Sequence, residues 1–442
     1  MSDAATPPKP LANDCFALPP GVHWTPVAEA LARLRARMRP IAPIERLPIE
    51  AVGGRILAED AVALRAHPAC DNAAVDGYAF AHPGTADPVE LKPAKGRAAA
   101  GAPWNGVLPA GQALRILTGA PMPEGADTVV LQEDVEEFPG GLISGRRLRF
   151  TPPKKPGANR RRAGENIRPG DRVLTAGARL SPQATAQLAA AGLSDLPVYA
   201  PLRVAVISTG SELAQPGAER DLTPDRVIDS NKPMLRGLVE TTGAEVAFIA
   251  TAGDTPEAVA RALDLATGSA DAVITSGGAS GGEEDHVAAA LSDAAAREQA
   301  GDEGDAFHLW RVAMKPGRPL AMGLWRGAPV FGLPGNPVAA FVCFLIFVRP
   351  ALLALGGAEW TEPRPLMLES GFDHPKKPGR REYLRVRIGE DGRLEKYRSE
   401  GSGLIEGLLW SDGLADLAHE AGPVNAGDRI AYLPYHAFGI RA

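Results

Sequence analysis

Unbroken apolar runs alternate with helix-like segments in the middle of the chain. From Arg203 onward, the runs VAVIST, EVAFIAT, DAVITSGG and APVFGLPG are separated by amphipathic segments. Strands that are buried on both faces read as continuous Val and Ile runs, and their alternation with helices is typical of a mostly parallel sheet with right-handed crossovers. We therefore predict a three-layer α/β domain over residues 201–356, with LWRVAM before Lys315 as a further strand.

The segments on either side follow other patterns. Residues 22–200 contain short strand-like runs such as VVLQEDV, RLRF and DRVL, broken by Gly and Pro. Two helices are predicted there, one N-capped at Thr25 with Pro26 as its first residue and one over SPQATAQLAAAGL. Residues 357–442 alternate apolar and polar positions at period two, which predicts a small C-terminal β domain. Residues 1–21 are expected to be a flexible tail.

Composition narrows the class of protein. The 442 residues are 45% hydrophobic and 23% charged, with a net charge of −6, which is ordinary for a globular protein and unlike a nucleic-acid-binding one. Cys15, Cys70 and Cys343 lack the spacing of a disulfide framework or a zinc site. The start shows no signal-peptide pattern, and the apolar run 338–348 is about half of what spans a bilayer. We expect a cytoplasmic protein without a membrane partner.

Small residues and carboxylates follow the predicted strands of the α/β domain. Ligands of open α/β sheets bind beyond the carboxyl ends of the strands. Glu212 follows the first strand, Asp254 the second, and the glycine-rich stretch 276–282 with Asp285 the third. Glycines let backbone N–H groups approach a phosphate closely, and a helix N-terminus adds partial positive charge. We therefore predict an anion cradle at 276–282, entering a helix at Glu283.

These features also have structural interpretations. A Gly/Ser-rich turn at a strand end is often an ordinary connection, and Asp254 before Thr255-Pro256 is suited to cap a helix. The stretch matches neither GxGxxG with a ribose-binding acid nor the P-loop, so neither a dinucleotide fold nor a Walker ATPase is predicted. The chain also has no HExxH or GxSxG motif.

Charged side chains at the same rim indicate a cation and an oxyanion. Carboxylates beside a phosphate cradle repel the ligand unless a divalent ion lies between them, so Glu212, Asp254 and Asp285 indicate Mg²⁺ held by oxygen ligands. Lys315 and Arg318 are separated by Pro-Gly and project from a stiff turn. They are candidates to bind a phosphate or a metal oxoanion, and a solvated charge pair is the alternative.

Eight motifs, spread in order over most of the chain, resemble those of the MoeA family of molybdopterin molybdenumtransferases, whose eukaryotic relative is the gephyrin E domain. They are DNAAVDGYA, RILTGAPMPEGADTVVLQED, RRAGENI, VISTGSEL, VIDSN, TSGGASGGEEDHV, MKPGRPL and FGLPGNPVA. The resemblance covers about Val22 to Tyr435. It implies two N-terminal subdomains, an α/β molybdopterin-binding domain and a C-terminal β domain.

The resemblance also implies an activity. Members take adenylylated molybdopterin and molybdate, release AMP in a Mg²⁺-dependent step, and leave molybdenum on the dithiolene. They are homodimers with the site at the dimer interface. Transient contacts with an adenylyltransferase and with apo-molybdoenzymes are therefore expected, and a nucleic-acid partner is not.

The family's functional positions map onto this sequence. Asp76 and Thr118 match active-site residues donated by the partner subunit, and Glu212, Asp254 and Asp285 match carboxylates around pterin, phosphate and Mg²⁺. The cations expected to hold molybdate are Lys315 and Arg318, completed by Arg381 or the neighbouring Arg380 and Arg385, and by Ser402. Further residues expected to bind the pterin nucleotide are Ser208, Thr209, Gly210, Ser276, Gly277, Gly278, Ser280, Pro334, Gly335 and Asn336.

Four positions depart from the family pattern. Asn166 stands where Asp is frequent, His286 where Tyr is frequent, Arg318 where Lys is common, and Ala339 where Ser follows NPV. Arg318 keeps the charge but replaces a point ammonium by a planar fork. Ala339 removes a hydroxyl that an oxyanion would meet, and His286 places an imidazole where a phenol is frequent.

Three other functions stay open. One is adenylyl transfer to molybdopterin, which a related α/β domain performs alone. Another is a scaffold, since the gephyrin relative anchors membrane receptors, although no partner-binding linker is visible here. The third is a preference for tungstate, because it resembles molybdate in size and charge.

Overall fold

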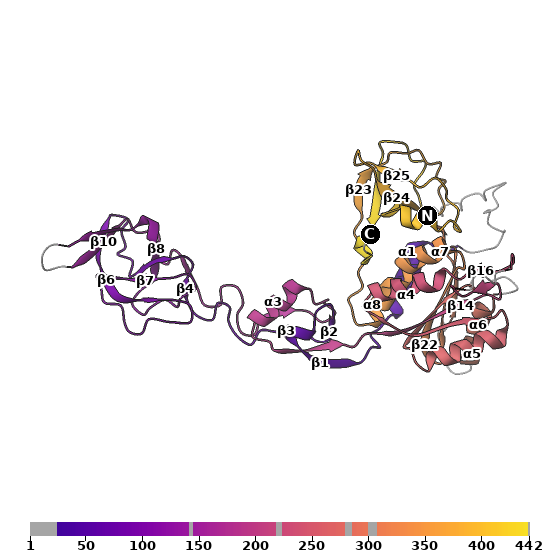
Figure 1. Cartoon of the computed structure of the whole chain (residues 1–442), viewed down its shortest axis with the longest axis horizontal. Helices are drawn as coiled ribbons and strands as arrows, with labels where there is room; N and C mark the ends of the chain where they lie inside the picture. The colour runs from indigo at the N-terminus through magenta and orange to yellow at the C-terminus, as the bar shows by residue number, and fades with distance from the viewer. Residues whose placement is uncertain (1–23, 141–144, 218–222, 279–284, 299–306, 441–442) are drawn as a thin grey trace, which may run out of the picture. The chain divides into compact units, whose positions relative to one another are not determined.

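The computed structural model describes residues 24–140, 145–217, 223–278, 285–298 and 307–440. Residue contacts divide the chain into two compact units (Figure 1). The N-terminal unit contains residues 46–53 and 59–198, and the C-terminal unit contains the chain up to residue 45, residues 54–58 and the chain from residue 199 onward. The chain passes from one unit to the other near three short strands, β1 (Ile44–Pro48), β2 (Ile56–Leu57) and β13 (Asp195–Tyr199).

A six-stranded sheet forms the centre of the C-terminal unit, in the order β17-β14-β18-β22-β21-β19. The first four strands are parallel, and the last two run antiparallel to their neighbours. This confirms the predicted mostly parallel sheet. The strands are β14 (Arg203–Thr209), β17 (Glu245–Ala252), β18 (Ala272–Ser276), β19 (Phe307–Arg311), β21 (Pro319–Trp325) and β22 (Ala328–Leu333).

Alternate residues of these strands enter two separate apolar layers. Val204 and Val206 of β14 pack with helices α1, α4, α7 and α8, whereas Ala205 and Ile207 pack with α5 and α6. Figure 1 shows these two groups of helices on opposite faces of the sheet. Burial on both faces explains the unbroken apolar runs of β14, β18 and β22. The prediction was wrong for EVAFIAT, because β17 is the edge strand of the sheet and is exposed at alternate positions. The helices are α1 (Val27–Arg37), α4 (Asn231–Thr241), α5 (Pro256–Thr267), α6 (His286–Glu298), α7 (Pro337–Cys343) and α8 (Arg349–Leu355).

The most apolar part of the chain is a core helix. Helices α7 and α8, joined by a π-helical stretch at Phe344–Val348, make one segment of 19 residues. Its apolar window has a mean hydropathy of 2.5, and 89% of that window is buried inside the protein. The segment is longer than the run 338–348 predicted, because the helix continues through Arg349 and Pro350. By length and composition it would reach across a membrane, but its side chains are used by the core.

The C-terminal β domain shares that core. Its sheet has the order β20-β24-β26-β27-β23, with β25 paired to β24. Tyr383, Leu414 and Leu433 of this sheet pack in the same apolar cluster as α7 and α8, which explains why contacts group the two parts into one unit. The elements are β20 (Met314–Lys315), β23 (Leu366–Glu369), β24 (Arg381–Ile388), β25 (Leu394–Lys396), α9 (Glu406–Trp410), β26 (Gly413–Leu417) and β27 (Arg429–Pro434).

The predicted strand LWRVAM is divided between two sheets. Strand β19 ends at Arg311, and β20 instead pairs with β24, where Lys315 lies opposite Glu382. The backbone N–H of Val312 donates to the carbonyl of Arg318 at 2.8 Å, which closes the turn before β21 returns along β19. The segment from Lys315 to Arg318 therefore lies in the connection between β19 and β21, two antiparallel strands of the α/β sheet.

Two details at helix starts differ from the prediction. Pro26, not Thr25, is the N-cap residue of α1, because Thr25 is paired with β-type hydrogen bonds to Arg311 and Ala313. The hydroxyl of Thr255, rather than Asp254, caps α5 by accepting from the N–H of Ala258 at 3.1 Å. The carboxylate of Asp254 is thus available to another partner.

The N-terminal unit is rich in short strands, as predicted. Its main sheet has the order β8-β5-β7-β6-β10-β9, in which only β6 and β7 pair in parallel among the described strands. The strands of this sheet are β5 (Gly77–Phe80), β6 (Val89–Ala98), β7 (Gln112–Ile116), β8 (Thr128–Leu131), β9 (Glu136–Pro139) and β10 (Arg146–Phe150). Two small ladders and a helix complete it, namely β3 (Ala61–Val62) with β12 (Arg172–Leu174), β4 (Asn72–Ala73) with β11 (Arg160–Arg161), and α3 (Pro182–Ala190).

The predicted boundaries at residues 21, 200 and 356 stay predictions. Contacts place helix α1 with the C-terminal unit, because Val27, Ala30, Leu31 and Leu34 bury its apolar stripe in that core.

Candidate active site

A pocket of about 820 Å³ lies where the α/β sheet meets the C-terminal β domain. Its wall is built from three sources: the segments that follow β14, β18 and β22, the turn between β19 and β21, and the segment after β25. This volume is within the range of small-molecule sites. The predicted residues that line the pocket are Glu212, Gly278, Asp285, Lys315, Arg318, Pro334, Gly335, Asn336 and Ser402.

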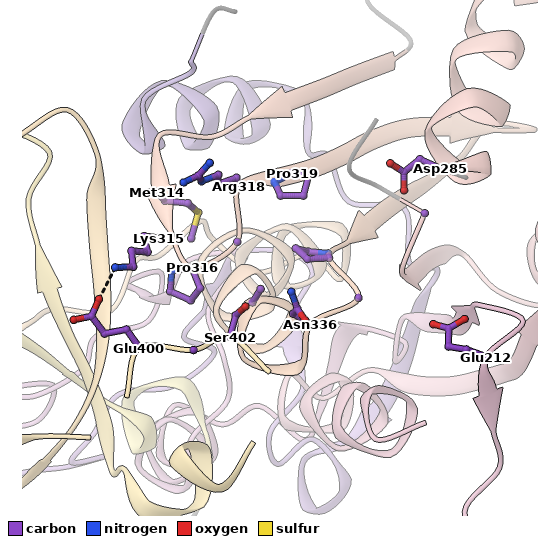
Figure 2. A pocket seen from close by; sticks show the side chains of 16 residues that line it. Glu212, Asp285, Met314, Lys315, Pro316, Arg318, Pro319, Asn336, Glu400 and Ser402 are labelled. Atoms are coloured by element: carbon purple, nitrogen blue, oxygen red, sulfur yellow. Dashed lines mark hydrogen bonds and ion pairs between the residues drawn. The ribbon is translucent and has the colours of Figure 1, made fainter. Parts of the chain in front are cut away.

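The two ends of this pocket carry different sets of charged side chains. Figure 2 shows the carboxylates of Glu212 and Asp285 at one end, and Lys315 with Glu400 at the other. Arg318 lies on the side of Lys315. The two ends therefore favour different parts of a ligand, a cation-bridged phosphate at the first and an anion at the second.

The carboxylate end is shaped by the segment after β14. Asp254 accepts a hydrogen bond of 2.6 Å from the backbone N–H of Ser211, and its own N–H donates to the Ser211 hydroxyl at 3.1 Å. This reciprocal pair fixes the residue directly before Glu212. Gly210 leaves space that the Glu212 carboxylate fills. Asp254 does not line the pocket, so its predicted contact with a metal ion stays a prediction.

Gly277, the first glycine of the predicted anion cradle 276–282, has no room for a side chain. Gly277 has φ +98°, and a Cβ there would lie 2.7 Å from the carbonyl oxygen of Thr209. Gly278 lines the pocket, whereas Ser208, Thr209, Gly210, Ser276 and Gly277 do not. The predicted residues Ser280 and Glu283 lie outside the described residues, and the described helix α6 begins at His286.

Asn231 is a positioning residue that the prediction missed. Its side-chain amide donates to the Ser276 hydroxyl at 2.7 Å and to the Gly335 carbonyl at 2.6 Å, so it ties the ends of β18 and β22 together. Asn231 is 8% exposed. The VIDSN motif contains this residue, and its position at the start of a helix gave no sign that it holds two strand ends.

The cationic end rests on the core helix. The Cys343 thiol lies beneath the turn and donates to the Gly317 carbonyl at 3.3 Å, and burial raises the pKa of that thiol to about 12. A Cβ at Gly317, where φ is +94°, would collide with the Cys343 sulfur. The Arg318 guanidinium lies 5.4 Å from the Trp24 ring centre. The turn that presents Lys315 and Arg318 is thus held from below and from the side.

Glu400 is a lining residue that the sequence analysis did not identify. It pairs with Lys315 across the pocket wall (Figure 2). The hydrogen bond with His374, followed by that with Lys315, holds the pKa of Glu400 below its usual range against the effect of burial. The sequence offers one signal for Glu400. It is a carboxylate in the glycine-rich run SEGSG, two positions before the predicted Ser402.

Arg385 holds the segment that carries Glu400 and Ser402. Its guanidinium donates to three backbone carbonyls, those of Ser399 at 2.6 Å, Leu404 at 2.6 Å and Gly401 at 3.1 Å. Arg385 is 5% exposed. This arginine therefore contacts the loop, and the structure does not bring it to the pocket surface.

Arg380 and Arg381 face carboxylates of the C-terminal domain. Arg380 donates through Nε to Glu382 at 3.0 Å, and Arg381 donates through Nε to Asp416 at 2.6 Å. Neither lines the pocket described above. Their predicted contact with molybdate stays a prediction, and it requires a change of partner for either side chain.

Asp76 and Thr118 lie together in the N-terminal unit. The backbone N–H and the hydroxyl of Thr118 both donate to one oxygen of Asp76, at 2.7 Å each. These two bonds, the hydroxyl's first, lower the pKa of the exposed Asp76 carboxyl. The carboxylate is therefore ionised and oriented, whereas its predicted place in a partner's site stays a prediction.

The carboxylate end fits Mg²⁺ that arrives with a phosphate. Mg²⁺ in proteins is commonly held by one or two carboxylates together with substrate phosphates and water, and Glu212 and Asp285 supply two carboxylates. Among the described residues, no group of three or more His, Cys, Asp or Glu side chains forms a metal cage on its own. These two carboxylates therefore suit an ion that is shared with the substrate, rather than one that the protein holds alone.

Family profiles match three consecutive parts of the chain. Residues 25–192 match the "MoeA N-terminal region (domain I and II)", residues 205–354 the "Probable molybdopterin binding domain", and residues 368–435 the "MoeA C-terminal region (domain IV)".

Curated relatives and solved structures resemble the chain over most of its length. It is 34% identical over 397 residues to the molybdopterin molybdenumtransferase of Haemophilus influenzae, covering 89% of this chain and 94% of that protein. It is 37% identical over 401 residues to molybdopterin molybdenumtransferase 2 of Mycobacterium tuberculosis, covering 89% and 95%. The crystal structure of the molybdopterin biosynthesis moeA protein from Pyrococcus horikoshii OT3 matches with a TM-score of 0.77 and 28% identity, over 93% of this chain and 100% of that one.

Proposed function

Since the chain belongs to the MoeA family of molybdopterin molybdenumtransferases, transferases of molybdenum cofactor biosynthesis, we propose that it inserts molybdate into adenylylated molybdopterin and releases AMP. The observation that carries this proposal is one pocket with two carboxylates at one end and, at the other, two cations, of which Lys315 is paired with Glu400. Both substrates are small anionic molecules, and the two ends suit the two anionic groups that must meet.

The carboxylate end is proposed to bind the phosphoanhydride. Glu212 and Asp285 would hold Mg²⁺, which supplies charge neutralisation as the bond to the adenylyl group breaks. Gly278 borders this end, and a backbone without side chains lets a phosphate approach closely. Asp254 supports Glu212 by fixing Ser211.

The cationic end is proposed to bind molybdate next to the dithiolene. Lys315 supplies a point charge, and Arg318 supplies a planar fork that binds two oxygens at once. Two unit charges about 4 Å apart interact by about 4 kcal/mol at an effective dielectric constant near 20. Two such cations on one turn would attract a dianion and orient it for reaction with the sulfurs. Ser402 and either Arg380 or Arg381 are proposed to complete this end.

A second subunit is part of the proposal. Asp76 and Thr118 would enter the pocket of a partner in a homodimer, as the family resemblance implies. The ionised Asp76 carboxylate accepts two hydrogen bonds from Thr118. This supports the proposal, because an exposed carboxylate held in one orientation is suited to contact a ligand. Transient contacts with the adenylyltransferase that makes the substrate and with acceptor apoenzymes, in the cytoplasm, belong to the same proposal.

The proposal is tested by reconstitution. Purified protein, adenylylated molybdopterin, Mg²⁺ and molybdate are combined, and both AMP release and activation of an apo-molybdoenzyme are measured. We expect AMP release that depends on molybdate in the wild type. Glu212→Ala should lower the rate by about 100-fold or more, since one positioned charge commonly supplies that factor.

Glu257→Ala is the matched control, because Glu257 is an exposed carboxylate in the first turn of α5 and does not line the pocket. Binding of the nucleotide without turnover would favour a scaffold, and formation of adenylylated molybdopterin from ATP would favour an adenylyltransferase. Either result contradicts insertion.

A further inference from the structure

Glu400 stands between two groups of cations. One carboxylate oxygen pairs with Lys315 at the cationic end of the pocket (Figure 2). The other oxygen lies 3.3 Å from His374 Nδ1 and 3.7 Å from Lys396 Nζ, both on the side of the C-terminal domain. Glu400 therefore has partners that remain if it loses Lys315.

The partners behind Glu400 are fixed in place. His374 Nε2 lies 2.8 Å from Glu382 Oε2, and these side chains are 3% and 2% exposed. Glu382 also accepts from Arg380 Nε at 3.0 Å, and Lys396 Nζ lies 3.3 Å from His374 Nδ1. This network leaves Glu400 in contact with His374 and the Lys396 ammonium through its other oxygen.

Two anions compete for Lys315. In the proposed function Lys315 binds the oxyanion, yet here it already neutralises a carboxylate of its own chain. Glu400 is part of the pocket wall, with a side chain that is 34% exposed, so an entering anion meets its charge directly. An oxyanion on Lys315 must either displace Glu400 or share the lysine with it, and like charges make sharing unfavourable.

We propose that Glu400 is a built-in competitor that sets the affinity of the pocket for oxyanions. It neutralises Lys315 in the empty pocket, and when an oxyanion takes its place it gives up Lys315 and keeps its contacts with His374 and Lys396. The affinity is thereby kept below what Lys315 and Arg318 would give alone, which limits occupation of the pocket by other abundant anions. This inference rests on the proposed function, because it takes the Lys315 end as the oxyanion site.

A merely structural role for Glu400 makes the opposite prediction. The pair joins the end of β20 to the segment after β25, so loss of a structural contact would disorder the pocket and weaken binding of an anion. Loss of a competitor strengthens it. The sign of the change in molybdate affinity thus separates the two roles.

The experiment measures binding of sodium molybdate to the full-length chain by isothermal titration calorimetry. We expect Glu400→Gln to bind molybdate about tenfold more tightly than the wild type, a typical size for coupling between two sites. Glu406→Gln is the control: Glu406 forms an exposed ion pair with Arg398 at 2.9 Å in the same part of the chain. Its molybdate affinity should equal that of the wild type.

A double-mutant cycle with Lys315→Ala completes the test. The gain from Glu400→Gln should disappear in the Lys315→Ala background, since the competition is for that lysine. Unchanged or weaker molybdate binding by Glu400→Gln overturns the inference while leaving the oxyanion site intact. Should that variant not fold, Glu400→Ala is measured in its place, with the same expectation. No molybdate binding by the folded wild type overturns the oxyanion site itself, and the inference with it.

Discussion

Thr118 gives one oxygen of Asp76 two hydrogen bonds, from its N–H and from its hydroxyl, each 2.7 Å long. Both stabilise the ionised carboxyl, which is why its pKa is lowered. The residues come from separate motifs of the N-terminal unit, and the pairing of β5 with β7 brings those motifs together. A local charge is thus prepared by a contact between two strands.

We predict that Thr118→Val raises the pKa of Asp76 toward its ordinary value of 3.8, because the hydrogen bond from the Thr118 hydroxyl is lost. The interaction stabilises the folded state at neutral pH, since the folded pKa lies below the unfolded one, and this contribution disappears as the pH falls through the folded pKa. Wild type and variant should therefore converge in stability in acid. Carboxyl ¹³C shifts of selectively labelled Asp report the titration.

Thr85→Val is the matched control, because the Thr85 hydroxyl donates to Asp87 at 2.7 Å in the same unit. The pKa of Asp76 should not move in that variant. An unshifted Asp76 in Thr118→Val would contradict the assigned cause.

The contact partners of single residues are less predictable from the sequence than the positions of motifs. Asp254 follows a strand as predicted, yet Thr255 caps the helix and Asp254 holds Ser211 instead. Arg380, Arg381 and Arg385 lie close together in the sequence, but each contacts a different partner within the C-terminal domain. Charge alone does not say which group a side chain meets.

At the scale of elements, short turns carry most of the pocket. The turn with Lys315 and Arg318 lies between strands of one sheet, while β20 within it pairs with another sheet. The segment with Glu400 and Ser402 has no regular structure of its own and depends on the carbonyl contacts of Arg385. Loops positioned by a rigid scaffold are the usual place for binding residues.

We predict that Arg385→Lys loosens the segment 399–404. A single ammonium cannot reproduce a fork that donates to three carbonyls, so buried acceptors lose their partners, at a cost of about 1–3 kcal/mol. Hydrogen exchange of amides in 399–404 should become faster, and the free energy of unfolding should fall by that amount. Arg387→Lys is the control, since Arg387 lies on the same strand, is exposed and pairs with Glu395. Equal exchange in both variants would contradict this role.

At the scale of the molecule, two units make different contributions. The C-terminal unit contains the pocket, and the N-terminal unit contains the Asp76–Thr118 pair. If a homodimer combines them, each active site needs residues from both subunits.

We predict that two inactive variants restore activity when their subunits are exchanged. Asp76→Asn and Glu212→Ala each damage every site of their own homodimer, whereas a mixed dimer has one site with both native residues. An equal mixture should recover about a quarter of the wild-type rate of AMP release, because half of the dimers are mixed and each has one intact site of two. Each variant incubated alone under the same conditions is the control. Formation of mixed dimers without any recovery would contradict the shared site.

Much of this protein is determined by its sequence. Apolar runs that are buried on both faces can form only inner strands, so the α/β domain was predictable from VAVIST, DAVITSGG and APVFGL, and the motifs indicated the rim at Glu212, Asp285 and Lys315. The tertiary structure decided which charges share a pocket. Glu400 and Lys315 are far apart in the sequence and meet only because β20 pairs with β24, and Asn231 acts on Gly335 only because β18 lies beside β22. Periodicity encodes which face of an element is buried, whereas long-range pairing of elements decides which polar groups face one another.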